Sequence, residues 1–475
     1  MSDTWPETWQ GDAVGLVEEF RSGRRSPREE LEASYAAIDA SDLNAVCFTD
    51  RETAMAAADR ADVTKPFGGV PVGVKELNKV EGWPDTEASV PFKDRIGTYT
   101  STMLTRLVRD GGAILAAQTT ASEFGGVNLT RTLLHGATHN PWKHGTGPGG
   151  SSGGSASVVA GGLLPIATGG DGGGSIRIPA GFTGLVGLKG TFGRIPLGPR
   201  MEYSNLTVAV GCLSRSVRDT ARWFDVTNGH HPTDPLSLPR VDGWEQDLGT
   251  HLAALRGRRV AVVPDWGGAT VSPIMWEVLA EAATLLIADA DLVQVDGIDT
   301  DVPRMGAAWS ISGMLGIEAE LGDHWPARAD ELTPQIRFAL EMTSGRYDAA
   351  ARARVEHART DINEAMARIF DVAAGGVDFV ITASNPDVAF AAEGPLPDTF
   401  GGIEAGAKIN GRLTFPANMH GNPAISVPAG FVDGLPVGLQ IVGRHFSEPL
   451  LLDLALTMER NRPWPLTSLG GAPAE

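Results

Sequence analysis

One lysine and two serines of this chain stand in settings that suit nucleophilic catalysis. Lys75 lies in the apolar run GVPVGVKEL, Ser151 lies in GPGGSSGGSA, and Ser175 follows the glycines of TGGDGGGSIRIPAGF. A serine hydroxyl is a weak nucleophile that needs an adjacent base, and a lysine can be that base when burial or nearby charge keeps it neutral. Glycines before Ser175 let successive N–H groups turn toward one point, as an oxyanion hole requires. The three residues thus offer a base, a relay and a nucleophile.

The serine loop is open to other interpretations. Five glycines and three serines within residues 147–156 have the composition of a flexible linker. Residues 149–153 also fit G-x-S-x-G, which would make Ser151 the nucleophile of an α/β-hydrolase with His420 or His445 as its base. The sequence GTGPG stands where the preceding apolar strand of that motif should be, and Lys75 would have no role. The lysine and the second serine therefore favour the first interpretation.

Phosphate and metal sites have less support. Glycine-rich turns can bind phosphate, but the chain has neither GxxxxGK[ST] nor a strand followed by GxGxxG. His135, His139 and His144 are spaced by four and five residues on a loop with glycine and proline, and no cysteine joins them. This spacing fits no helical pair of metal ligands. We expect these histidines to be loop residues, with no metal and no organic cofactor.

The elements that must position these residues alternate between helix and strand. Helical patterns fill residues 10–62, where Ser26 suits an N-cap and Pro27 a first helical position. Strand-like and helix-like runs then alternate to the end of the chain, which predicts an α/β fold with a central mixed, twisted sheet covered by helices on both faces. The strand-like runs are GVPVGVKEL, AILAAQTT, LPIATGG, RRVAVVPD, VDFVITAS, PAISVPAGF and LPVGLQIVG.

We expect one domain over residues 1–475. Its parts are a helical N-terminal arm at about 10–65, a catalytic core at about 66–225, a less regular pocket-shaping region at about 225–375 and the C-terminal part of the core at about 376–465.

Composition limits the partners and the compartment. Acidic residues outnumber basic ones by 58 to 39, which gives a net charge of −19 and disfavours a nucleic-acid partner. The two cysteines, Cys47 and Cys212, are far apart and lack a CxxC pattern, as in proteins of reducing compartments. We see neither a signal peptide nor an apolar run of membrane-spanning length. The sequence therefore predicts a cytoplasmic protein without a membrane partner.

The motifs together resemble the amidase signature family. GVPVGVKE, GPGGSSGGSA and GGDGGGSIRIPAGFTGLVGLKG occur in the family's order, and Ser151 and Ser175 are 24 residues apart (175 minus 151), as the family's two serines are. Four further segments resemble the family, so the resemblance covers about residues 10–465: ASEFGG (121–126), THNPW (138–142), LTFPANMHGNPAISVPAGF (413–431) and GLPVGLQIVG (434–443).

The resemblance implies the amidase signature fold and a Ser-cisSer-Lys triad. In that triad neutral Lys75 accepts a proton through Ser151, the serine that follows a cis peptide bond in this family, while Ser175 attacks the substrate carbonyl and forms an acyl-enzyme. It also implies two supporting groups. The oxyanion donors would be the N–H groups of Gly172, Gly173, Gly174 and Ser175, and the bracing residues would be Ser152, Asp171 and Arg177.

Substrate class follows from the resemblance and from the segments expected to form the pocket. The chain is similar to nylon-oligomer hydrolases, aryl acylamidases and urethane-cleaving amidases, and segments 125–135, 200–206 and 303–345 are mostly apolar. An uncharged small-molecule amide, anilide or carbamate is therefore the expected substrate, and a homodimer is a further expectation. The alternative within the family is a glutamine-hydrolysing amidotransferase subunit. Gly172 and Gly190 depart from the family pattern, where Thr or Ile and proline respectively are usual; both leave the catalytic atoms in place.

Overall fold

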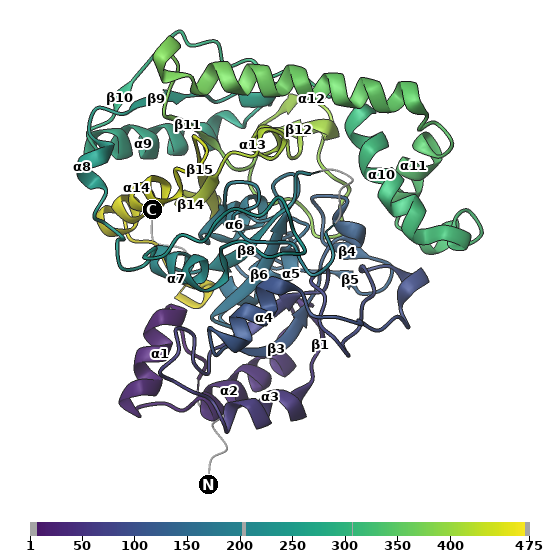
Figure 1. Ribbon diagram of the computed structural model, residues 1–475, viewed down its shortest axis with the longest axis vertical. Helices are drawn as coiled ribbons and strands as arrows, with labels where there is room; N and C mark the ends of the chain where they lie inside the picture. The colour runs from purple at the N-terminus through teal and green to yellow at the C-terminus, as the bar shows by residue number, and fades with distance from the viewer. Residues whose placement is uncertain (1–6, 202–205, 306, 471–475) are drawn as a thin grey trace.

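The computed structural model describes residues 7–201, 206–305 and 307–470. Helices α1 (Ala13–Ser22), α2 (Pro27–Ala40) and α3 (Arg51–Ala58) form the N-terminal arm and gather at one end of the molecule (Figure 1). The Ser26 side chain caps α2 and forms a capping box with Glu29, which satisfies backbone donors that the first turn leaves free. A short strand, β1 (Val46–Phe48), separates α2 from α3, and a pattern of three residues is too short to predict it.

The first large sheet carries the lysine strand. Its order is β1-β3-β2-β6-β8, with β2 parallel to both β3 and β6, and with β1 and β8 antiparallel at the edges. The four longer strands are β2 (Pro71–Lys75), β3 (Ile114–Thr119), β6 (Ile166–Asp171) and β8 (Ala209–Ser214). The helices of this half are α4 (Thr102–Arg109), α5 (Gly153–Ala160), α6 (Arg177–Thr183) and α7 (Val217–Thr227).

The second large sheet has the order β10-β9-β11-β15-β14-β7 and is also mixed. It contains a hairpin whose two-residue turn, Asp433-Gly434, has positive φ at both positions, as the favoured hairpin turn requires. The strands are β7 (Gly187–Lys189), β9 (Arg259–Val262), β10 (Val293–Gln294), β11 (Phe379–Ala383), β14 (Ala424–Val432) and β15 (Leu435–Gly443).

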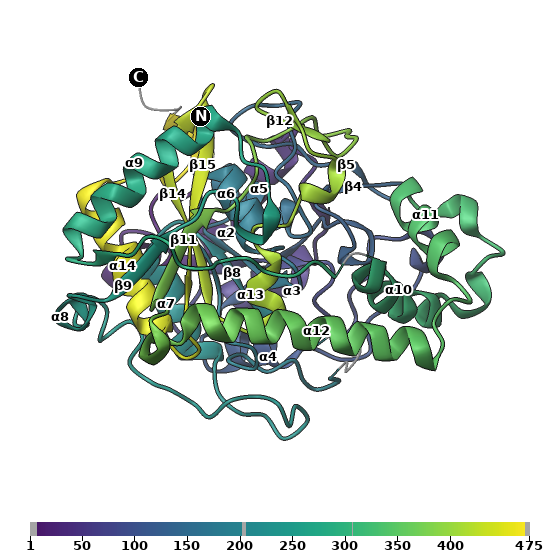
Figure 2. The same ribbon diagram turned by 90° about the horizontal axis from the view of Figure 1, so that it is seen from above.

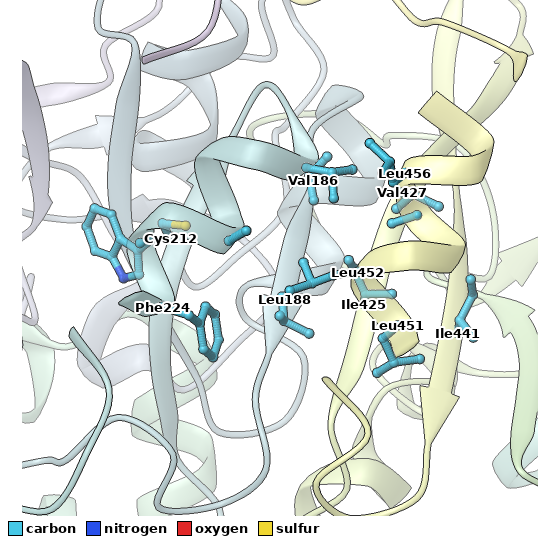
Figure 3. Close-up of a cluster of buried hydrophobic side chains, with 14 of the residues drawn as sticks. Val186, Leu188, Cys212, Phe224, Ile425, Val427, Ile441, Leu451, Leu452 and Leu456 are labelled. Atoms are coloured by element: carbon cyan, nitrogen blue, oxygen red, sulfur yellow. The ribbon is translucent and has the colours of Figure 1, made fainter. Parts of the chain in front are cut away.

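The two sheets meet at Val186 and Ser214, whose backbones exchange hydrogen bonds of 2.9 and 3.1 Å. Apolar side chains from β7, β8, β14, β15, α7 and α14 (Glu448–Asn461) pack across this junction (Figure 3). Helices cover both faces of the joined sheet: α2, α3, α5 and α6 contribute to one core cluster, and α1, α4, α7, α9 (Pro273–Asp289) and α14 to another. The predicted mixed α/β fold is confirmed.

A helical hairpin stands to one side of the sheets in both views (Figures 1 and 2). It consists of α10 (Ala307–Leu321) and α11 (Pro334–Thr343), and it packs on Phe92 and Phe124, which precede and follow β3 in the chain. Of the segments expected to form the pocket, residues 202–205 and 306 lie outside the described residues.

The remaining α-helices and strands are short or peripheral to the two large sheets. They are α8 (Leu252–Leu255), α12 (Ala349–Phe370), α13 (Phe415–His420) and the two-residue strands β4 (Arg131–Thr132), β5 (Gly136–Ala137), β12 (Thr399–Phe400) and β13 (Ile403–Glu404). None of the helices in the described part of the chain is long and apolar enough to cross a bilayer.

Candidate active site

Lys75 is the last residue of β2, and the strand directs its side chain at the serine loop. Its backbone N–H donates to the Thr168 hydroxyl on the neighbouring strand β6 at 2.8 Å. Its Nζ lies 2.7 Å from Ser151 Oγ and 2.9 Å from Ser152 Oγ, and 3.4 Å from the carbonyl oxygen of Gly170. The structure therefore brings the predicted base onto the predicted relay serine, with only 2% of the lysine exposed.

The electrostatic setting of Lys75 makes the neutral amine accessible near neutral pH. Burial lowers the pKa of Lys75 to about 7, against the opposing effect of the negative charges of Asp171, Glu87 and Glu76. The three groups that its Nζ contacts, two hydroxyls and one carbonyl, are uncharged. A lysine in this setting can act as a general base near neutral pH.

The glycine-rich stretch 147–156 is packed, not flexible. Every residue in it is buried. The N–H of Gly150 donates to Asn128 Oδ1 at 2.9 Å, and the peptide bond between Gly150 and Ser151 is cis. A Cβ at Gly154 would lie within 2.5 Å of the Thr120 backbone, so glycine is needed there for close packing. The interpretation of this stretch as a linker is therefore wrong.

Ser175 lies in the turn between β6 and α6 and is partly exposed, whereas Lys75 and Ser151 are buried. The turn depends on Gly174, which has φ +132° and whose added Cβ would lie 2.2 Å from Thr414 Oγ1. The Gly174 N–H donates to Asp171 Oδ1 at 2.8 Å. Because that N–H is engaged by a carboxylate, the prediction of Gly174 as an oxyanion donor is wrong. The N–H groups of Gly172, Gly173 and Ser175 stay predicted donors.

Asp171 and Arg177 hold this turn from inside. Both side chains are fully buried, and the guanidinium donates to both Asp171 oxygens, at 2.9 and 3.0 Å. Burial by itself raises the pKa of Asp171, but the charge and hydrogen bonds of Arg177 and a hydrogen bond from Asn418 hold it well below its ordinary range. Asp171 is therefore a stable anion, and it accepts hydrogen bonds from the backbone N–H groups of Gly174 and Ile176. The structure thus brings the two predicted bracing residues together.

Sequence reasoning missed the outer partners of this ion pair. Arg177 also donates to Thr414 O at 2.8 Å, to Gln440 Oε1 at 2.6 Å and to Asn418 Oδ1 at 2.5 Å. All three belong to segments that carry the family resemblance. The motifs therefore marked these residues as part of the family pattern, but they did not show that the residues bind Arg177. Arg177 therefore ties the Ser175 turn to the second sheet.

The loop histidines do not form a group of their own. His135 hydrogen-bonds to Glu76 at 2.9 Å, while the rings of His139 and His144 stack on each other with centroids 3.9 Å apart. Cys47, Glu76 and His135 form a group whose candidate ligand atoms all lie within 4.8 Å of one another. The Glu76 carboxylate in it also accepts hydrogen bonds from the Ala121 N–H and the Thr86 hydroxyl. Hydrogen bonds from protein groups therefore compensate the burial of Glu76. This arrangement fits a structural role for the cluster.

Comparison with known proteins finds a family model and several relatives that match most of the chain. The family model described as Amidase matches residues 29–452. An acylamidase of Rhodococcus erythropolis is 32% identical over 95% of this chain and 95% of its own length. A glutamyl-tRNA(Gln) amidotransferase subunit of Synechococcus sp. (strain CC9311) is 33% identical over 94% of this chain and 96% of its own length. The crystal structure of a bacterial aryl acylamidase, described as one of the amidase signature enzymes, superimposes with a TM-score of 0.86 at 26% identity, over 96% of this chain and 97% of that one.

The match of the family model covers most of the chain, and the fold agrees with that of a solved family member. The family's members hydrolyse amide bonds. The chain therefore belongs to the amidase signature family and is an amide-bond hydrolase.

Proposed function

We propose that the chain cleaves the carbon–nitrogen bond of an uncharged, non-peptide amide, anilide or carbamate through Lys75, Ser151 and Ser175. The observation that carries the proposal is the 2.7 Å contact between the buried Lys75 Nζ and Ser151 Oγ. A neutral amine has two N–H donors and one lone pair. The donors suit Ser152 Oγ and the Gly170 carbonyl, which leaves the lone pair for the Ser151 hydroxyl.

The proposed reaction has two halves. In the first, Ser175 Oγ attacks the carbonyl carbon while its proton passes to Ser151 and the Ser151 proton passes to Lys75. The C–N bond then breaks, the proton returns through Ser151 to the leaving amine, and an ester with Ser175 remains. In the second half, water takes the place of the amine and the same relay carries its proton. The sum is one amide and one water converted into one acid and one amine.

The developing oxyanion would be held by the N–H groups of Gly172, Gly173 and Ser175. Donors of this kind stabilise the transition state only when they are fixed before the reaction. Asp171 and Arg177 supply the fixation here, since the turn is bonded to a buried ion pair. Ser152 supports the base by its contact with Lys75.

The substrate class is supported by the surroundings of the relay serine and by the relatives. A Cβ placed on Gly125 would lie 3.2 Å from Leu77 and 3.4 Å from Ser151 Oγ, and the next glycine lies against Ile336 of the helical hairpin. Leu77 and Ile336 are apolar side chains beside this loop, and apolar surroundings suit an uncharged substrate. An acylamidase and an aryl acylamidase are among the similar proteins.

Two alternatives differ in their support. Glutamine hydrolysis for an amidotransferase remains a candidate because an amidotransferase subunit is as similar to this chain as the acylamidase is. The α/β-hydrolase alternative has less support: His420 Nδ1 contacts Asn422 Oδ1 at 2.6 Å, and His445 Nε2 contacts the His420 carbonyl at 2.8 Å, while Ser151 pairs with Lys75.

The test is amine release from a panel of glutamine, a primary fatty amide, an acyl anilide, an aryl carbamate and the uncharged cyclic dimer of 6-aminohexanoate. Ser175→Ala is assayed beside the wild type. Turnover of uncharged substrates that disappears in Ser175→Ala supports the proposal. Turnover of glutamine alone would replace it with the amidotransferase function, and turnover that survives in Ser175→Ala would contradict Ser175 as the nucleophile.

A further inference from the structure

A buried carboxylate connects the helical hairpin to the relay serine. Glu123 opens a short 3-10 helix, η2 (Glu123–Gly125), and is 2% exposed. Its Oε2 accepts hydrogen bonds from the Thr333 N–H at 2.8 Å and from the Thr333 hydroxyl at 2.5 Å. Its Oε1 accepts one from Ser89 Oγ at 2.6 Å. No salt bridge is found for Glu123 within the described residues, so three neutral donors compensate its burial.

The contact with Thr333 is a helix cap supplied from another part of the chain. Thr333 is the N-cap residue of α11, and its own side chain caps none of the helix N–H groups. In a capping box the backbone N–H of the N-cap is bonded by a glutamate three residues later in the same helix. Here Glu123, 210 residues earlier, takes that role. Its negative charge also lies at the helix end where the backbone dipole favours an anion.

The other side of the same loop lies against Ser151. The Ser122 N–H donates to the Ser151 carbonyl at 3.2 Å, and a Cβ on Gly125 would lie 3.4 Å from Ser151 Oγ. A Cβ on Gly126 would lie 2.6 Å from Ile336 Cδ1 of α11, so helix and loop are in close contact on both sides of η2. One loop of five residues thus contacts both the hairpin and the relay serine.

The loop is held in a conformation that it would not adopt alone. Phe124 has φ +52° and ψ 15°, a left-handed conformation that is strained for a non-glycine residue. Its N–H donates to the Glu87 carbonyl at 2.9 Å, and its ring packs edge to face on Phe92 with centroids 6.0 Å apart. Strain of this kind persists only where surrounding contacts enforce it.

From these contacts we infer that Glu123 is a positioning residue, which fixes the loop against Ser151 by joining it to Thr333 of the α10–α11 hairpin. The inference rests on the proposed role of Ser151 as relay. It makes the seating of the hairpin a condition for turnover, because the hairpin determines where the loop can lie.

Steady-state kinetics of Glu123→Ala and Glu123→Gln on the best small substrate of the panel test this inference. A displacement of about 1 Å at a reacting group can cost about 100-fold in rate. We expect kcat to fall about 10- to 100-fold in Glu123→Ala, with KM changed less than about threefold. Glu123→Gln should retain most of the activity, because its amide oxygen can still accept both Thr333 bonds and its NH2 can donate to Ser89.

Two further variants separate positioning from loss of folding. Thr333→Val removes the hydroxyl contact with Glu123 while leaving the backbone N–H, so a folded protein with reduced kcat is expected even if Glu123→Ala does not fold. The matched control is Glu29→Ala, which removes a glutamate that accepts a hydrogen bond from the N-cap N–H of α2 in the N-terminal arm, away from the hairpin and the serine loop. Its kcat should equal that of the wild type, and thermal unfolding of every variant is measured alongside.

The outcomes are distinct. Wild-type kcat in folded Glu123→Ala, wild-type kcat in Thr333→Val, or equal losses in Glu123→Gln and Glu123→Ala would each overturn the inference. Ser175→Ala, assayed in parallel, distinguishes this failure from failure of the proposed function. If Ser175→Ala is inactive and folded Glu123→Ala is fully active, only the positioning role is refuted.

Discussion

The pH dependence of turnover tests the ionisation state on which the proposed chemistry depends. The pKa of Lys75 is lowered by burial to about 7, and a general base acts only in its unprotonated form. With that pKa, about a tenth of the free enzyme carries neutral Lys75 at pH 6 and about nine tenths at pH 8. We therefore expect kcat/KM to rise about tenfold from pH 6 to pH 8 and then to level off.

A lysine with its ordinary pKa of 10.5 gives a different profile. The rate would then rise about tenfold with each pH unit up to about pH 10. Initial rates on a neutral anilide, measured below KM at constant ionic strength from about pH 5.5 to about pH 9.5, distinguish the two profiles. A rise that continues past pH 9 would refute the conclusion that Lys75 is the neutral base.

A second buried lysine provides the control for this profile. Burial also lowers the pKa of Lys189 to about 7, but its Nζ donates to the Gly190 carbonyl at 3.0 Å. In Lys189→Met the acid limb should keep its position, whatever the absolute rate, because the proposed relay contains Lys75 and not Lys189. If the acid limb disappeared in Lys189→Met, the limb would report the ionisation of Lys189, and its assignment to Lys75 would be wrong.

The remaining predictions concern the turn that carries Ser175. Gly174→Ala should unfold at least about 2 kcal/mol more easily in urea, since its φ is left-handed and its Cβ would lie 2.2 Å from Thr414 Oγ1. Gly172→Ala is the matched control: among the described residues its Cβ would meet only Val208, at 3.3 Å, so a loss below about 1 kcal/mol is expected. Arg177→Met should cost about 3–5 kcal/mol in the same experiment, because it leaves a buried Asp171 carboxylate unpaired. A loss under about 1 kcal/mol in Arg177→Met would show that the ion pair does not brace the turn.

The local features of the fold could be predicted from the sequence. Apolar runs gave the strand that ends at Lys75, and Ser26 with Pro27 gave the start of α2, because both signals lie within a few residues of the element they define. The strand β1 was missed, since three residues show no period and its stability comes from pairing with β3.

The site could be predicted in part. Motif order was enough to place Lys75 and Ser151 in one site, and the structure brings them to 2.7 Å. Contacts between distant segments were not predictable: Glu123 meets Thr333 across 210 residues, and Arg177 meets Gln440 across 263. A glutamate before a phenylalanine, or a glutamine within a strand, carries no local sign of a buried partner. These contacts form only when segments far apart in the sequence pack together in the folded protein, so a local sequence pattern does not predict them.

The most direct test of the central claim is to trap the acyl-enzyme and locate it. The wild type is mixed with excess anilide, quenched in acid during the first turnovers and digested for peptide mass spectrometry, with Ser151→Ala as the companion because it slows the relay and keeps Ser175 Oγ. No lysine or arginine separates Ser151 from Ser175, so the modified serine is assigned by fragmentation of the peptide. The account predicts an acyl group on Ser175 in both proteins. An acyl group on Ser151 in the wild type, absent from Ser151→Ala, would contradict it.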